Sequence, residues 1–219
     1  MISLLNYLPI LLKGLLFTLE ISIISVVLGM SLGILVGLLQ THKKVPKWIQ
    51  MLCKGYVSII RGTPIFVQLL LMYFGIPQIL PIELSAFQAG IITLTLNAGG
   101  YVAEIVRAGL NAVPKGQWEA CKALGYSDIQ TLKSVIMPQA MMTMLPALGN
   151  ELIIQIKESS VLMILGVPEL TKVSKELASS ELKPMEIYLL AGALYYVLTG
   201  TVSALLKVLE RRTYVVKSI

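Results

Sequence analysis

The sequence predicts an all-α integral membrane protein, a single helical bundle of five transmembrane helices. Hydrophobic residues make up 56% of the 219 residues, only 14% are charged, and the mean hydropathy is +0.79. This composition leaves too little polar surface to cover a water-soluble globule. The apolar residues gather in runs long enough to span a bilayer, and the basic residues gather between those runs.

The five spans follow from the length of the apolar runs, because a membrane-spanning helix needs about 20 mostly apolar residues. We therefore expect one transmembrane domain over residues 1–219, with spans at about 14–39, 55–80, 86–110, 138–165 and 186–207. Gly62 and Pro64 in the second span, and Pro138 and Pro146 in the fourth, interrupt the helical hydrogen-bond ladder. Such breaks are tolerated where protein or water satisfies the freed groups, so we expect kinked helices that line a cavity.

The first span carries a stripe of small residues. Gly29, Gly33 and Gly37 stand four residues apart, which places them on one helix face and lets another helix approach closely. The same stretch spells the G-x-S-x-G pattern of a hydrolase around Ser31, but that pattern needs a strand before the serine and a catalytic histidine. Since the one histidine, His42, follows the span in a basic loop, we interpret the stripe as a packing surface.

The basic residues indicate the direction of the chain. Three alternate connections are basic, with His42, Lys43, Lys44, Lys47 and Lys54, then Lys115, Lys122 and Lys133, and finally Lys207, Arg211, Arg212 and Lys217, whereas the other two hold either no basic residue or charges of both signs. By the positive-inside rule these connections are cytoplasmic, so the N-terminus lies outside and the C-terminus inside. Because the basic residues share no amphipathic face, the net charge of +6 indicates topology and not a nucleic acid partner.

Residues 114–138, between the third and fourth spans, are polar and amphipathic. Apolar residues recur there at three- and four-residue steps, which predicts a helix on either side of a break. Gly125 can end the first helix in a left-handed conformation, and Ser127 with Gln130 forms a capping box for the second. This segment is too polar to cross the membrane, so we expect it at the cytoplasmic surface, where it either presents a face to a partner or anchors the loop.

Polar residues at membrane depth form two groups with the same spacing. The third span holds Asn97, Tyr101 and Glu104, and the fourth holds Glu151, Gln155 and Glu158, followed by Ser159. Each trio at i, i+4 and i+7 occupies one narrow helix face. Ionisable residues are costly in lipid. These side chains therefore either bond between helices or line a pocket.

Several motifs resemble one protein family. The segment around Glu119 resembles the EAA loop of the membrane subunits of ATP-binding-cassette importers, which runs Glu-Ala-Ala, three residues, Gly, nine residues, Ile-x-Leu-Pro. The matching positions here are Glu119, Ala120, Cys121, Gly125, Val135, Met137 and Pro138, with Cys121, Val135 and Met137 as small or apolar replacements. "RGTP" (61–64), "NAGGYVAEIVRAGL" (97–110) and "LPALGNELIIQIKESSVL" (145–162) are similar to stretches of the polar amino acid permeases of histidine, glutamine and arginine systems.

The resemblance implies partners for the chain. Two ATP-binding subunits would dock at the EAA segment, at Glu119, Ala120, Gly125, Ser127 and Asp128. These partner subunits would bind the ATP and Mg. A second permease subunit, identical or closely related, and an extracytoplasmic solute-binding protein would complete an importer in a prokaryotic cell membrane. No Gly-Lys pair occurs in the chain, which excludes a Walker A loop. We therefore expect neither a cofactor in this chain nor enzymatic activity of its own.

The resemblance also implies an amino acid as the solute. A site for it needs an acidic group for the ammonium and donors for the carboxylate, and the polar residues at membrane depth supply these types: Asn97, Tyr101, Glu104, Glu151, Gln155, Glu158 and Ser159. The surplus of carboxylates favours arginine, lysine or histidine. Alternatives are a permease for glutamine, glutamate or another small solute, and a membrane scaffold or receptor that transports nothing. An intramembrane enzyme is disfavoured, because neither a nucleophile with a base nor a metal cluster occurs.

Overall fold

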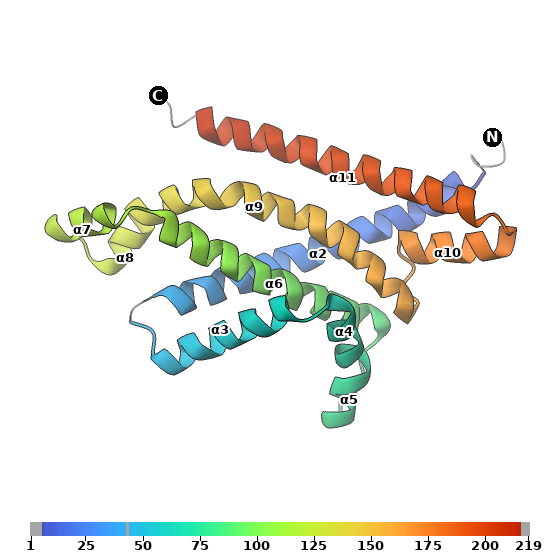
Figure 1. The fold of residues 1–219 in the computed structure, drawn as a ribbon, viewed down its shortest axis with the longest axis horizontal. Helices are drawn as coiled ribbons and strands as arrows, with labels where there is room; N and C mark the ends of the chain where they lie inside the picture. The colour runs from blue at the N-terminus through green and yellow to red at the C-terminus, as the bar shows by residue number, and fades with distance from the viewer. Residues whose placement is uncertain (1–5, 43, 216–219) are drawn as a thin grey trace.

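The computed structural model describes residues 6–42 and 44–215, and within these ranges the chain forms helices, turns and loops but no strand. The predicted all-α class is therefore confirmed. The long helices α2 (Leu8–Thr41), α6 (Ala86–Ala112), α9 (Met137–Glu158) and α11 (Pro184–Val215) run alongside one another (Figure 1). The basic residues Lys43 and Lys217 lie outside the described residues, as do the side chains of Arg211 and Arg212.

Three of the described helices are long and apolar enough to cross a membrane: α2, α6 and the Pro184–Glu210 part of α11. A fourth crossing is possible if Lys47–Gly62 and Ile65–Ile79 together form one bent span. The predicted fourth span corresponds to α9, which contains Glu151, Lys157 and Glu158 and is not among the helices that pass the same criterion. The count of five spans therefore stays a prediction.

The second span is not a straight helix. Helix α3 (Lys47–Gly62) begins eight residues before the predicted start at residue 55 and ends before Pro64. After an extended Thr63, which is the conformation expected before proline, the chain turns by 110° into α4 (Ile65–Leu70), the π-helical turn η1 (Leu71–Gly75) and α5 (Ile76–Ile79). This arm projects from the side of the bundle (Figure 1). The interruption predicted at Gly62 and Pro64 is thus confirmed, but its size is not a property that the local sequence reveals.

Helices α2 and α6 make the closest packing in the bundle, and the glycine stripe allows it. A Cβ atom added at Gly33 would lie 2.5 Å from Cβ of Val102, and one added at Gly37 would lie 2.7 Å from Cβ of Val106. Gly29 meets Ala98 in the same way, at 2.6 Å. The predicted packing role of the stripe is confirmed, since no larger side chain fits these three positions.

Helices α6 and α9 pack antiparallel. Gly109 of α6 contacts Met144 of α9, whereas Gly90 contacts Leu162. Residue numbers at facing positions therefore add up to nearly the same value along the seam, which places Asn97 at the level of Gln155. After α9 the chain tightens into a 3-10 helix, η3 (Ser159–Leu165), which ends at Gly166 with a φ of 81°.

A buried hydrogen-bond network connects α10 (Leu170–Glu181) to α2 and α11 at one end of the bundle. The Glu169 carboxylate caps this helix by accepting from the amides of Thr171 at 2.8 Å and Lys172 at 2.7 Å. It also accepts from the Tyr195 hydroxyl of α11 at 2.9 Å. Thr18 of α2 accepts from the Leu170 amide at 3.0 Å. These bonds hold α2, α10 and α11 together at the end opposite α7 (Lys115–Ala123) and α8 (Asp128–Thr131) (Figure 1).

Candidate functional site

Two short helices joined by a tight turn make up the segment that resembles the EAA loop. Helix α7 ends in a Schellman motif, in which the Tyr126 amide donates to the Cys121 carbonyl and the Gly125 amide donates to the Lys122 carbonyl, both at 3.0 Å. Gly125 has a φ of 76°, in the left-handed region. Helix α8 begins with the predicted capping box between Ser127 and Gln130. The predicted helix, break and helix are therefore confirmed.

One side of this segment is anchored and the other is exposed. Cys121 is buried, and Trp118 packs against the core shared by α6 and α9. On the outer side Leu124 and Ile129 are each 74% exposed. The predicted docking residues Glu119, Ala120, Gly125, Ser127 and Asp128 are all exposed. Exposed apolar side chains on a rigid polar element are typical of a docking surface, and the docking role of these residues stays a prediction.

The connection between α2 and α3 also touches this segment. The Lys44 ammonium lies 2.8 Å from the Asp128 carboxylate. Its hydrogen bond and charge hold the pKa of Asp128 below the usual value, so the ion pair persists at neutral pH. Sequence spacing did not point to this contact, because Lys44 and Asp128 are far apart in the chain. We call this end of the bundle, formed by α7, α8, His42 and residues 44–46, the coupling end.

The polar residues of α9 lie in the interior. Glu151 is 2% exposed, and Gln155 and Ser159 are fully buried. The Gln155 amide nitrogen donates to Glu151 at 3.3 Å and to Glu158 at 3.4 Å, while the Ser159 hydroxyl donates to the carbonyl of Ile156. Among the described residues Glu151 has no ion-pair partner, and Lys157 is exposed and pairs with no carboxylate.

Two buried acceptor atoms at this level lack hydrogen bonds. They are Oδ1 of Asn97 and Oε1 of Gln155, neither of which has a partner among the described residues. Buried polar atoms are nearly always bonded to protein or water. A buried carboxylate one helical turn from two unbonded acceptors is an arrangement that a ligand with several N–H donors would complete.

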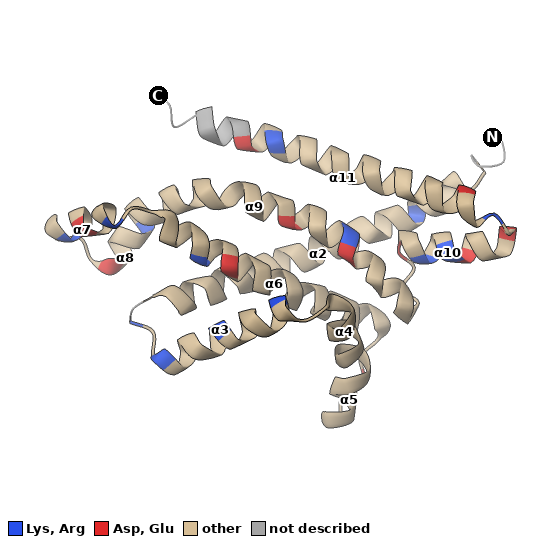
Figure 2. Ribbon diagram, viewed as in Figure 1, with Lys and Arg blue, Asp and Glu red and all other residues tan. Residues whose placement is uncertain are grey.

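The predicted face of the third span divides in the structure. Asn97 points toward α4, where its amide nitrogen donates to Gln68 at 3.1 Å. Tyr101 and Glu104 instead line a cavity of about 630 Å³ between α2, α3 and α6. There the Glu104 carboxylate accepts from Arg107 at 2.8 Å and 2.6 Å. Figure 2 shows that charged positions in the middle of the bundle are few and occur on α3, α6 and α9.

The structure therefore brings together only part of the predicted set. Asn97 of α6, Glu151 and Gln155 of α9, and Ser159 at the start of η3 are buried at neighbouring levels, whereas Tyr101 and Glu104 belong to the cavity. Glu158 is half-buried beside Gln155. Sequence reasoning missed Gln68, which bonds Asn97, and Lys54, which lines the cavity with Tyr101 and Glu104. A signal for Gln68 was its place just after the "RGTP" break, where freed carbonyls need donors.

The relationship to known proteins rests on a family profile that matches residues 29–214 and is described as the binding-protein-dependent transport system inner membrane component. The chain belongs to this family. The putative glutamine transport system permease protein GlnP of Rickettsia typhi is 38% identical over 203 residues, covering 93% of this chain and 92% of that protein. The arginine transport system permease protein ArtQ of Bacillus subtilis is 37% identical over 205 residues, with the same coverage.

Solved structures show the same fold. A crystal structure of an amino acid ABC transporter with histidines matches with a TM-score of 0.90 at 39% identity, covering 96% of this chain and 97% of that chain. An inward-facing structure of the MetNI methionine ABC transporter matches with a TM-score of 0.82 at 21% identity, over 95% of this chain and 98% of that one. The second match is a likeness of fold alone.

Family membership confirms the resemblance to the membrane subunits of polar amino acid importers. The chain is a multi-pass membrane permease subunit, and the ATPase of these systems is a separate subunit. The names of these relatives give different solutes, glutamine and arginine. The solute of this chain must therefore be inferred from its own residues.

Proposed function

We propose that this chain forms the translocation pathway of an ATP-driven importer of a polar amino acid, with arginine, lysine or histidine favoured and glutamine as the alternative. The observation that carries the proposal is the buried carboxylate of Glu151, which has no cation beside it among the described residues. Relatives that are named glutamine and arginine permeases support the class of solute.

The chemistry of the site favours an ammonium ligand. An ionised carboxylate in an apolar interior is strongly destabilising unless a cation or several donors compensate it. The Gln155 amide supplies one neutral donor to Glu151. The ammonium of an amino acid carries three N–H donors, enough to bond Glu151 together with the unbonded acceptors of Gln155 and Asn97. Ser159 and Glu158 border this position and would influence the choice of side chain.

The partners follow from the same proposal. Two ATPase subunits dock at the exposed side of α7 and α8, a second permease subunit completes the pathway, and an extracytoplasmic binding protein delivers the amino acid. The coupling end faces the cytoplasm, as does the C-terminus, and the N-terminus lies outside the cell. ATP favours the closed ATPase pair, and its differential affinity for that state shifts the permease between inward-facing and outward-facing forms.

The experiment is uptake into proteoliposomes that contain the chain, its ATPase, its permease partner and the binding protein. Arginine, lysine, histidine, glutamine and glutamate are supplied in turn, with and without ATP. ATP-dependent accumulation of one or more of them is the expected result. Intact complexes that accumulate no amino acid would contradict the proposal and favour a scaffold or receptor.

A further inference from the structure

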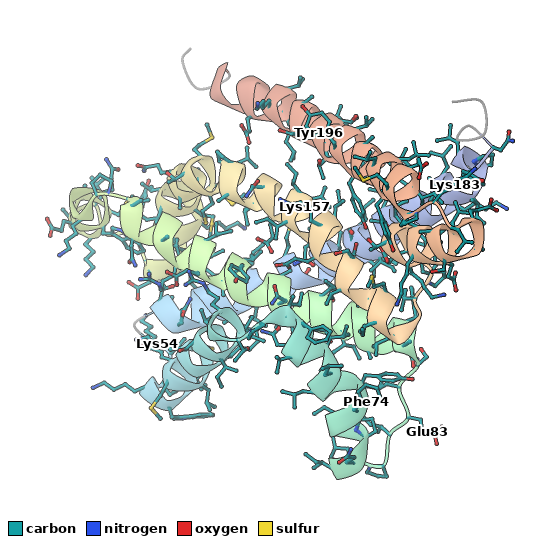
Figure 3. All side chains as sticks on the ribbon, turned by 45° about the vertical axis from the view of Figure 1, so that its right-hand side comes forward. Lys54, Phe74, Glu83, Lys157, Lys183 and Tyr196 are labelled. Carbon is teal, nitrogen blue, oxygen red and sulfur yellow. The ribbon has the colours of Figure 1, made fainter. Side chains whose placement is uncertain are left out.

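The cavity between α2, α3 and α6 extends from the middle of the bundle toward the coupling end. It is lined by Gln40 near the C-terminal end of α2, by Lys54, Val57, Ser58, Arg61 and Gly62 from the middle to the end of α3, and by Tyr101, Glu104 and Arg107 in the second half of α6. Its volume of about 630 Å³ falls within the range of small-molecule sites, about 300–1,000 Å³. Figure 3 shows Lys54 on α3 at this end of the molecule.

The cavity carries more positive than negative charge. Three cations, Lys54, Arg61 and Arg107, face a single carboxylate, that of Glu104. Arg107 occupies this carboxylate with two hydrogen bonds, and the Arg61 guanidinium lies 3.7 Å from it. Lys54 has no ion pair among the described residues. Two positive charges are thus left without a compensating anion.

Arg61 is held in place although its charge is only partly compensated, because it shares the Glu104 carboxylate with Arg107. Its guanidinium lies 5.7 Å from the ring centre of Tyr101, within the range of a cation–π contact. The planar guanidinium can still bond the two oxygens of a carboxylate side by side. A positioned arginine beside an unpaired lysine is a suitable arrangement for binding a small oxyanion.

The cavity also adjoins the buried site. Tyr101 is one helical turn from Asn97, on the side toward the coupling end. Gln68 links the buried site to the cavity wall. Its side-chain carbonyl accepts from Asn97, and its amide nitrogen donates to the backbone carbonyl of Ile60, directly before Arg61. The same antiparallel packing places Glu151 level with Tyr101, so the cavity begins beside the buried site and extends from it toward the coupling end.

We propose that this cavity is a second binding station for the amino acid, in which Lys54 and Arg61 hold its α-carboxylate after it leaves the buried site. The inference rests on the proposed function, since it takes the solute to be an amino acid. The carboxylate chemistry is common to every amino acid, so the station serves passage and does not select the side chain. A phosphate of an anionic lipid has similar oxyanion chemistry and is the competing occupant.

The test measures binding of radiolabelled arginine, histidine and glutamine to the complete transporter in nanodiscs. Wild type is expected to bind two amino acids per permease subunit, one of them lost in Glu151→Gln. In the Glu151→Gln background, Lys54→Gln should weaken the remaining binding by about tenfold or more, the scale of a lost charge-assisted hydrogen bond. The carboxyl-amidated amino acid should not compete for this remaining binding.

Lys47→Gln is the matched control, because it removes the same charge from the same helix at an exposed position outside the cavity. The second variant is Arg61→Gln, which should have the same effect as Lys54→Gln if the complex still assembles with its ATPase. Unchanged binding in Lys54→Gln would overturn the proposal. So would a Lys54 dependence that appears only as retention of phosphatidylglycerol over phosphatidylcholine, since this would assign the cavity to a lipid phosphate.

Wild-type uptake distinguishes a failure of the second station from a failure of the proposed function. If the wild-type complex imports an amino acid and Lys54→Gln binds it unchanged, the second station is wrong and the proposed function stands. If the wild-type complex imports no amino acid, the proposed function is wrong, and the station falls with it.

Discussion

At the residue scale, the side chain of Gln68 holds the break in the second span. Its amide nitrogen donates to the carbonyls of Ile60 at 2.8 Å and Thr63 at 3.1 Å, and its carbonyl accepts from Asn97. Because Pro64 has no N–H and the chain turns by 110°, these carbonyls have lost their helical donors. One side chain therefore satisfies the broken backbone and fixes Asn97.

Replacing Gln68 by leucine should destabilise the protein by about 1–3 kcal/mol, since the buried Asn97 amide loses its acceptor and the part-buried carbonyl of Ile60 loses its donor. Gln68→Glu, which keeps the size but loses the donor, should act in the same direction. The measurement is the thermal unfolding midpoint of the purified complex in detergent. Gln78→Leu is the control. It is the same substitution at an exposed position on α5, where those hydrogen bonds are not present. Equal midpoints for Gln68→Leu and Gln78→Leu would contradict the assigned role.

Helical spacing predicted the candidate residues but not their partners. Asn97, Tyr101 and Glu104 share a face of α6, as the spacing requires, yet Asn97 bonds Gln68 while Glu104 bonds Arg107 and approaches Arg61. Which groups meet this face depends on the bend between α3 and α4, and that bend is a tertiary feature. Periodicity along one helix carries no information about it.

At the scale of the element, the segment with α7 and α8 was predictable because its chemistry is local. The Schellman motif at Gly125 and the capping box at Ser127 involve residues at most five positions apart. The Lys44–Asp128 ion pair was not predictable, since it joins distant segments. The exposed position of the segment follows from its polarity, and its rigidity follows from its caps.

Weakening these caps should impair coupling to the ATPase. Gly125→Ala forces an alanine into a left-handed conformation at a cost of about 1 kcal/mol, and Ser127→Ala removes a cap worth about 0.5–2 kcal/mol. We expect the double variant to retain less ATPase on copurification and to lose solute-stimulated ATP hydrolysis.

Gly116→Ala is the control, because it lies inside α7 in open space and should slightly stabilise that helix. If the double variant and Gly116→Ala retain equal amounts of ATPase, the caps are not needed for docking.

At the scale of the whole molecule, the glycine seam between α2 and α6 determines how closely these two helices pack. Gly33→Ala should destabilise the protein by about 1–3 kcal/mol, the usual cost of overpacking, because its Cβ would lie 2.5 Å from that of Val102. Gly55→Ala is the control, since nothing lies within 4 Å of that position. A comparison of unfolding midpoints in detergent checks this, and equal midpoints would refute tight packing at Gly33.

The bundle as a whole was predictable from its apolar runs and its glycine stripe, whereas the arm formed by α4 and α5 was not. Apolar composition shows that residues 65–79 avoid water. It does not show that they leave the axis of α3 by 110°. The same limit applies to the cavity, whose lining residues come from α2, α3 and α6 and are brought together only by the packing of these helices.

The most direct test of the central claim is the uptake kinetics of the reconstituted importer with Glu151→Gln. We expect the variant to assemble with its ATPase and to raise the KM for the transported amino acid by about tenfold or more, because the ammonium loses its charged partner. Glu83→Gln, an exposed loop change, should behave as wild type. An unchanged KM and kcat in Glu151→Gln would show that the amino acid passes without using the buried carboxylate, and the proposed site would be wrong.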